Sequence, residues 1–79
     1  MPDGPSRVRW TGHARVKAQL LNAPPADIED AVIEGHGSRR SNRGPAAWRL
    51  IVGRWVILYD YPDEDDASSA RIVTLWRHR

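Results

Sequence analysis

Residues 48–61 read WRLIVGRWVILYDY, two runs of alternating apolar side chains on either side of Gly53-Arg54. This pattern predicts a β-hairpin, because glycine takes the positive φ needed at the first central position of a type II′ turn. The turn sets a register in which Val52 faces Trp55. One side of the hairpin then carries six large residues, which other elements must cover, because a hairpin alone is marginal in water. These residues are Trp48, Leu50, Val52, Trp55, Ile57 and Tyr59.

The composition of the 79-residue chain indicates one small domain with one core. There is no cysteine, which is consistent with a reducing compartment. No apolar run approaches the roughly 20 residues that span a bilayer, and MPDGPS at the N-terminus has no signal-peptide character. We therefore expect a cytoplasmic protein without a membrane segment, disordered over residues 1–6 and folded as a single α+β domain over residues 7–79.

Charge is distributed unevenly along the chain. The formal net charge is +2, but residues 60–66, DYPDEDD, hold five of the ten acidic residues. The remainder is strongly basic, which favours a polyanionic partner. Arginine outnumbers lysine eleven to one. High genomic GC content produces the same bias, so this preference is weak evidence for phosphate recognition.

The first half of the chain predicts one strand and two helices. Residues 7–10, RVRW, alternate like a short edge strand. Thr11 is a suitable N-cap for a helix of about ten residues over 13–22, on which Val16 and Leu20 form an apolar stripe widened by Ala14, Ala18 and Leu21. Residues 25–35 predict a second helix, with Pro25 at its first position, acidic residues in its first turn and Gly35 as its stop.

The second half predicts loops and strands. Residues 35–46, GHGSRRSNRGPA, have almost nothing to bury and predict a loop, with room for a short irregular strand over 38–41. The acidic segment 60–70 predicts an exposed loop, and RIVTLWR over 71–77 alternates like a final strand. The predicted fold is therefore α+β, with two helices packed on one face of a mainly antiparallel four-stranded sheet in the order β-α-α-β-β-β.

This order, together with WRLIVGRWVILYD and RIVTLWRHR, resembles the RelE/ParE-like toxins of bacterial toxin–antitoxin modules. The N-terminal half, VRWTGHARVKAQL followed by ADIEDAVIEG, looks more like a sister group, the small domain of unknown function 4258. The matches span roughly residues 8–78, and every motif is short.

The resemblance implies a site on the sheet face away from the helices, where the ribosome-dependent ribonucleases of the RelE group place basic catalytic side chains. Arg49 matches the basic residue after the first hairpin aromatic, and Arg77 or Arg79 matches the basic residue that ends the last strand. Two other basic positions of the family fall on Ile51 and Val56. Aliphatic side chains neither bind phosphate nor move protons, so the constellation would be partial at best. ParE-like members also lack it and act by binding.

Metal-independent RNA cleavage needs a base near the 2′-OH, an acid near the leaving oxygen, and cations where charge develops on phosphorus. His13 near a helix N-terminus is the candidate base, with Arg49 and Arg77 as catalytic cations. The alternative for His13 is a partly buried histidine hydrogen-bonded to the sheet. Tyr59 is a candidate acid only if it lies outside the core. Other expected nucleic-acid contacts are Arg39, Arg40, Arg43, Arg71 and Arg79.

The centre of the same face is apolar. Ile51, Val56 and Leu58, extended by Val73 and Leu75, predict an exposed patch. Such a patch, rimmed by arginines, suits an acidic antitoxin protein or a second copy of this chain. The histidines lack i, i+4 spacing and no nucleotide-binding motif is present, so we expect neither a metal nor a cofactor.

The resemblance thus implies a growth-inhibiting toxin component that acts on RNA, including ribosome-bound message, and binds an antitoxin on the same face. The alternative is a non-catalytic interaction domain of the same fold, either a ParE-like binder or a homodimerising domain. The sequence is compatible with an enzyme and with a binding domain.

Overall fold

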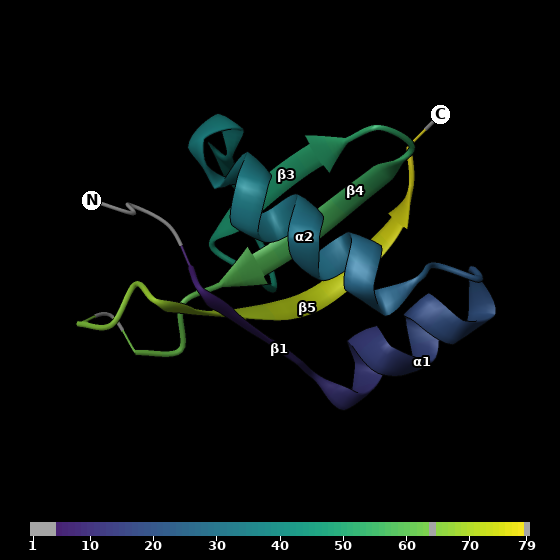
Figure 1. Ribbon diagram of the computed structural model, residues 1–79, viewed down its shortest axis with the longest axis horizontal. Coiled ribbons are helices and arrows are strands. Elements are labelled where there is room, and N and C mark those ends of the chain that lie inside the picture. The colour runs from purple at the N-terminus through teal and green to yellow at the C-terminus, as the bar shows by residue number, and fades with distance from the viewer. Residues whose placement is uncertain (1–4, 64, 79) are drawn as a thin grey trace.

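The computed structural model describes residues 5–63 and 65–78. The hairpin predicted from residues 48–61 forms the centre of a sheet flanked by two helices (Figure 1). In chain order, the elements are β1 (Arg7–Trp10), α1 (Gly12–Leu20), α2 (Pro25–Gly35), the short 3₁₀ helix η1 (His36–Ser38), β2 (Arg40–Ser41), β3 (Trp48–Val52), β4 (Trp55–Asp60) and β5 (Ser69–Arg77).

The sheet has five strands in the order β1-β5-β4-β3-β2. β2–β3, β3–β4 and β4–β5 are antiparallel, whereas β1 pairs with β5 in parallel. The predicted α+β class and mainly antiparallel sheet are confirmed. The fifth strand is the two-residue β2, which lies within the segment where a short irregular strand was expected.

The turn between β3 and β4 has the predicted geometry. Gly53 has φ of 58°, and Val52 pairs with Trp55, as a type II′ turn requires. The pairs Leu50–Ile57 and Trp48–Tyr59 follow in register, which puts the six large side chains on one face. On that face Leu50, Ile57 and Tyr59 are fully buried, while the three others are partly buried against them.

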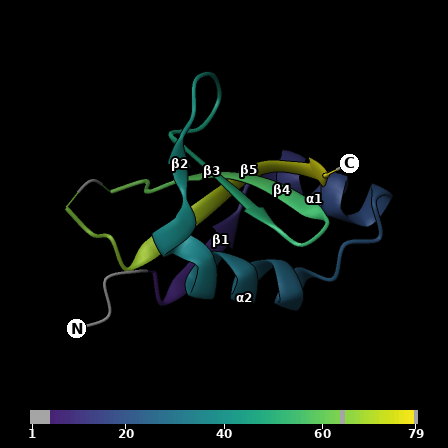
Figure 2. The same cartoon turned by 90° about the horizontal axis from the view of Figure 1, so that it is seen from above.

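α2 covers this face of the sheet. It contributes Ile28 and Val32, one turn apart and fully buried, to the core cluster. Pro25 occupies its first turn and the helix ends at Gly35, as predicted. We call the opposite side of the sheet, away from α2, the open face. Figure 2 shows α2 on one side of the sheet and the loop between β2 and β3 rising on the other.

α1 lies beside the second half of β5, beyond the end of the shorter β1 (Figures 1 and 2). Its N-cap is Thr11, as predicted, whose side chain accepts a hydrogen bond from the Ala14 amide. The predicted apolar stripe is wrong for Val16 and Leu20, which are 56% and 75% exposed, and correct for Ala14 and Ala18, which enter the core. We attribute this to the close approach of helix and strand, which small side chains allow.

A β-bulge changes the alternation of β5. Leu58 pairs with Thr74 but Tyr59 pairs with Ile72, so Val73 is the extra residue. Ile72 and Leu75 consequently both face the core and are fully buried. The prediction that Leu75 extends an exposed patch on the open face is therefore wrong, because strict alternation does not hold through a bulge.

The predicted disordered segment, residues 1–6, lies partly outside the described residues. Where it is described, Pro5 is buried and the Ser6 amide donates to the Ser68 carbonyl oxygen at 2.8 Å. Pro5 and Ser6 are thus held against the rest of the chain. In the described part of the chain, no helix is long and apolar enough to cross a membrane.

The burial difference between two isoleucines of the hairpin predicts very different stability effects. Ile57 is fully buried, so Ile57→Ala is expected to lower the free energy of unfolding by about 2–5 kcal/mol, a large part of the stability of a small domain. Ile51 is exposed on β3, so Ile51→Ala is the matched control and should change it by about 0.5 kcal/mol or less. Urea unfolding measures both variants, and equal losses would contradict the assignment of the two faces.

Candidate functional site

A row of side chains crosses the open face. Residues directly opposed in an antiparallel ladder project to the same side of the sheet. Arg40 pairs with Arg49, Arg49 with Leu58, and Leu58 with Thr74. The row therefore runs through β2, β3, β4 and β5, with two exposed arginines at one end.

His13 of α1 extends this row beyond Thr74. Its Nε2 lies 3.1 Å from Thr74 Oγ1, and its side chain is exposed. Thr11 holds the start of α1 in place, because its hydroxyl donates to the Val73 carbonyl oxygen at 3.0 Å. The expected hydrogen bond between His13 and the sheet is present, but the expected partial burial is not. We call the set Arg40, Arg49, Leu58, Thr74 and His13 the Arg49 row.

The next row along the strands is apolar. Val56 pairs with Ile51 on one side and Trp76 on the other. Ile51 and Trp76 are exposed, but Val56 is only 4% exposed, as is Leu58 in the Arg49 row.

The predicted patch is thus correct only for Ile51. Val56 and Leu58 lie on the central strand β4, where side chains of β3 and β5 on both sides reduce their exposure. Trp76 is exposed in the same row as Ile51 instead, a position that strict alternation does not predict because the bulge shifts the end of β5.

The third row contains the ion pair of Arg71 and Asp60. Arg71 Nε and Nη2 lie 3.2 and 3.0 Å from the two carboxylate oxygens of Asp60. Arg9 of β1 is in register with Arg71. The hydrogen bonds to Asp60 raise the pKa of Arg71, so it keeps its charge, but its guanidinium is engaged with a carboxylate. The Arg71 guanidinium is therefore less available to a phosphate than expected, and Arg9 is an exposed cation that the prediction omitted.

Two predicted site arginines lie away from the Arg49 row. Arg77 is on the side of β5 opposite Trp76, with its guanidinium carbon 5.7 Å from the centre of the Trp55 ring and Nη2 3.4 Å from the Leu21 carbonyl oxygen. Arg39 is partly buried, with its guanidinium 4.3 Å from the ring centre of Trp48. The structure therefore does not bring Arg77 together with His13 and Arg49.

Two further predicted contacts are in loops or termini. Arg43 is exposed in the loop between β2 and β3, which rises on the side of the open face. Asn42 organises this loop, because its side-chain amide donates to the carbonyl oxygens of Arg43 and Ala46. Arg79 lies outside the described residues.

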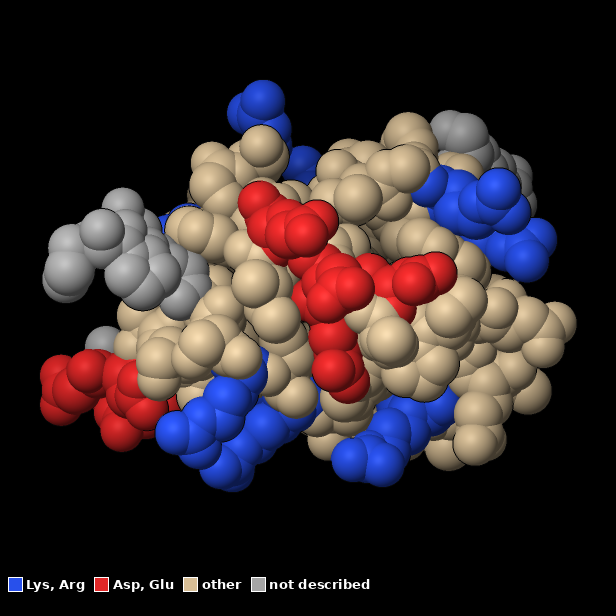
Figure 3. Space-filling view, in the orientation of Figure 1, with Lys and Arg blue, Asp and Glu red and all other residues tan. Residues whose placement is uncertain are grey.

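Acidic side chains are concentrated over α2, with basic side chains bordering them in the same view (Figure 3). Figure 3, drawn from the side of α2, shows acidic side chains over the middle of that helix. They belong to Asp27, Glu29, Asp30 and Glu34. The three rows of the open face hold Arg9, Arg40, Arg49 and Arg71 against one carboxylate, Asp60. A polyanion is therefore expected to approach from the open face.

Tyr59 lies on the covered side of the sheet. Its side chain is fully buried, and its ring meets that of Tyr61 edge-on at 5.9 Å between centroids. Burial, with a smaller contribution from Tyr61, raises the pKa of Tyr59 far above its ordinary value. Tyr59 was a candidate acid only if it lay outside the core, and it lies in the core.

The Arg49 row therefore combines cations for phosphate with an imidazole for proton transfer. Arg49 and Thr74 are two strand spacings apart, roughly 10 Å between backbones, with Leu58 between them. A nucleic-acid strand lying across the row would meet the arginines first and His13 at the far end. Within residues 5–63 and 65–78, no three potential metal-ligating side chains form a group.

Comparison with known proteins identifies the fold. Neither a scan against protein-family models nor a search of curated proteins gives a match. Among solved structures, the chain is similar to a chain of the toxin–antitoxin complex RelBE2 from Mycobacterium tuberculosis, with 24% sequence identity and a TM-score of 0.64. The match covers 95% of this chain and 99% of that chain. The protein thus has a RelE-like fold.

The comparisons separate the two resemblances stated from the sequence. The resemblance to the RelE group is confirmed for the fold. The closer likeness of the N-terminal half to the domain of unknown function 4258 has no support, because no family model matches the chain.

The buried Tyr59 predicts a specific loss of stability at alkaline pH. The folded protein holds the Tyr59 proton more tightly than the unfolded chain, whose tyrosine pKa is about 10. This contribution to stability is complete below that pH and is lost as the pH rises above it. Tyr59→Phe should lose less stability than wild type between pH 9 and pH 11.5. Tyr61→Phe should lose nearly as much as wild type. Urea unfolding across this pH range measures the effect, and parallel curves for wild type and Tyr59→Phe would contradict it.

Proposed function

We propose that this protein is the toxin component of a bacterial toxin–antitoxin pair, which binds RNA on the open face and cleaves it without a metal ion. The observation that carries the proposal is the Arg49 row, in which Arg40, Arg49 and His13 share one face of the sheet. The RelE-like fold adds support, since the solved neighbour belongs to a toxin–antitoxin complex.

In the proposed reaction, the 2′-oxygen of RNA attacks the adjacent phosphorus and the bond to the 5′-oxygen breaks. His13 removes the 2′-OH proton, which requires its ring nitrogen to leave Thr74 and accept that proton. Arg49, with Arg40 beside it, stabilises the negative charge that develops on the phosphoryl oxygens. Water protonates the leaving 5′-oxygen, because Tyr59 lies on the other side of the sheet. The products are a 2′,3′-cyclic phosphate and a 5′-hydroxyl.

The same face is proposed to bind the antitoxin. The exposed side chains of Ile51 and Trp76 provide apolar contact above Val56, and the arginines of the neighbouring rows attract acidic side chains. An acidic amphipathic segment bound there would cover Arg49 and so block RNA. A second copy of this chain is the other protein partner that this face suits.

A non-catalytic binding domain of the same fold is the second candidate. The observation that favours it is the apolar gap between the two ends of the Arg49 row, where Leu58 separates Arg49 from Thr74 and His13. Ile51 and Val56 also stand where the RelE group is expected to have basic residues. A binder needs the arginines of the row but not His13.

Cleavage measurements on variants of the row distinguish these candidates. His13→Ala and Arg49→Ala are each expected to lower RNA cleavage by about 10²-fold or more, since each removes a group that acts in the transition state. The two losses should combine non-additively. Arg54→Ala, at the exposed hairpin turn outside the row, is the matched control and should keep near wild-type activity. The enzymatic proposal fails if wild-type protein, freed of any bound partner, cuts neither naked nor ribosome-bound RNA.

Salt dependence of RNA affinity tests the interface itself. Binding to single-stranded RNA should weaken steeply with salt, because each phosphate contact releases counterions. Arg40→Ala and Arg49→Ala should each reduce the slope of log K against log salt by about 0.7, and Arg54→Ala should leave it unchanged. Fluorescence anisotropy measures these slopes. An RNA affinity that does not change with salt, or equal slopes in all variants, would contradict RNA binding on the open face.

A further inference from the structure

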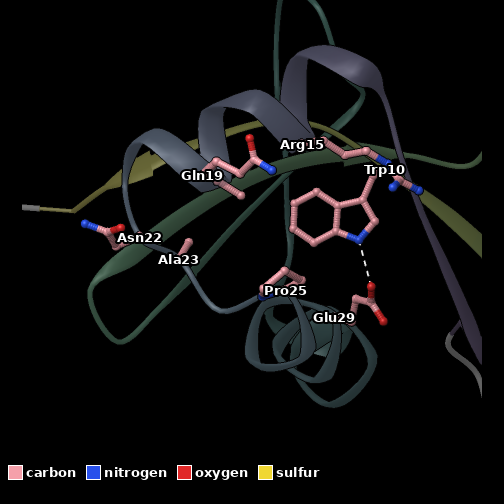
Figure 4. A pocket seen from close by; sticks show the side chains of 8 residues that line it. Trp10, Arg15, Gln19, Asn22, Ala23, Pro25 and Glu29 are labelled. Atoms are coloured by element: carbon pink, nitrogen blue, oxygen red, sulfur yellow. Dashed lines mark hydrogen bonds between the residues drawn. The ribbon is translucent and has the colours of Figure 1, made fainter.

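A cavity of about 430 Å³ lies between α1, α2 and the end of β1 (Figure 4). Its apolar lining includes Ala18 and Ala23, whose small side chains leave the space open. The volume is within the range of about 300–1,000 Å³ usual for small-molecule sites. The cavity is separate from the Arg49 row: Arg15 lines it, and Arg15 and His13, two residues apart on a helix, point to nearly opposite sides of α1.

The indole of Trp10 is held in a fixed orientation at this cavity. Its Nε1 donates a hydrogen bond to Glu29 Oε2 at 2.8 Å, which ties the end of β1 to α2. Figure 4 shows the ring pointing into the space between the helices. The bond satisfies the only polar group of the indole and leaves its π surface at the cavity. A flat aromatic ligand is suited to such a surface, because stacking does not require the protein to rearrange.

Two charged groups of opposite sign line the same cavity. Glu29 uses Oε2 for Trp10, and its Oε1 is an acceptor for a ligand N–H group. Arg15 is exposed, and within residues 5–63 and 65–78 it forms no salt bridge. Gln19 and Asn22 add amide groups at the rim. The lining therefore offers an aromatic plane, an acceptor, a cation and neutral amides.

We propose that this cavity binds a nucleoside monophosphate unit, with the base stacked on Trp10, an N–H of the base donated to Glu29 Oε1, and the phosphate bound by Arg15. Each part of this ligand meets a group that suits it: the base a π surface, its N–H edge a carboxylate, and its phosphate a guanidinium. An aliphatic side chain of a protein partner would use the alanines but leave both charged groups without a role. The unit comes either from a free nucleotide or from the 5′-phosphorylated end of an RNA.

The test follows the indole N–H resonance of Trp10 by NMR. AMP and GMP are titrated into the full-length, ¹⁵N-labelled protein, and adenosine and inorganic phosphate are titrated separately. We expect a saturable shift of the Trp10 signal with the nucleotides and weaker binding of adenosine and of phosphate, since each lacks one part of the ligand. A 5′-phosphorylated trinucleotide that binds more tightly than AMP would identify an RNA end as the source, and the opposite order would identify the free nucleotide.

Matched variants keep the test independent of folding. Arg15→Gln removes an exposed charge and should weaken AMP about tenfold or more, the loss expected for a charge-assisted contact. Lys17→Gln makes the same charge change on the other side of α1 and should leave the affinity unchanged. Gln19→Trp, at an exposed position of the rim, should block binding by filling the cavity.

The proposal is overturned if no nucleotide shifts the Trp10 signal, or if Arg15→Gln binds AMP as tightly as Lys17→Gln does. Neither result bears on the Arg49 row, whose variants are assayed by RNA cleavage and by the salt dependence of RNA binding. Likewise, absence of RNA cleavage would not contradict nucleotide binding in the cavity, because the NMR titration measures that binding directly.

Discussion

The left-handed conformation of Gly53 is the constraint on which the rest of the structure depends. With φ of 58° it closes a two-residue turn, and the turn determines the pairing of every residue of β3 with one of β4. A slip by one residue would move Leu50 to the open face and Arg49 into the core. The same register therefore produces both the buried face, where α2 packs, and the row of side chains that we propose meets RNA.

The bulge at Val73 has a comparable effect on the other side of β4. Before the bulge, β5 pairs with both β1 and β4, and Ile72 enters the core. After it, Leu75 takes the core position, so Thr74 and Trp76 project to the open face. β1 has ended by this point, and α1 takes its place beside β5, which brings His13 within hydrogen-bonding distance of Thr74. The candidate site is thus assembled where a strand irregularity and a helix start coincide.

We propose that the charge distribution directs different partners to the two sides of the molecule. The acidic side chains of α2 repel a polyanion from the helix side, while the arginines of the open face attract it. The cavity at Trp10 is an exception to this division, since Arg15 and Glu29 offer both charges within a small space. A small ligand with a base and one phosphate is suited to such a mixed lining, whereas a long RNA strand is suited to the broad basic face.

The sequence alone determined the elements whose signals are local. The hairpin register, the N-cap at Thr11 and the helix that begins at Pro25 each depend on residues a few positions apart, so turn chemistry and capping predict them. The fold class followed from their order. The face of Arg49 also followed, because alternation within one hairpin does not depend on the rest of the chain.

Contacts between distant segments decided what the sequence did not show. Alternation predicted Leu75 on the open face, but the bulge arises from pairing between β4 and β5 and leaves no local mark on RIVTLWR. Helical periodicity centred the buried stripe of α1 on Val16 and Leu20, with Ala14 and Ala18 at its edge, yet the two alanines are the residues that enter the core. Burial of Val56 and Leu58 depends on neighbours from two other strands, and the cavity at Trp10 exists only where α1, α2 and β1 meet. These features depend on packing across the whole chain, and no short stretch of sequence encodes them.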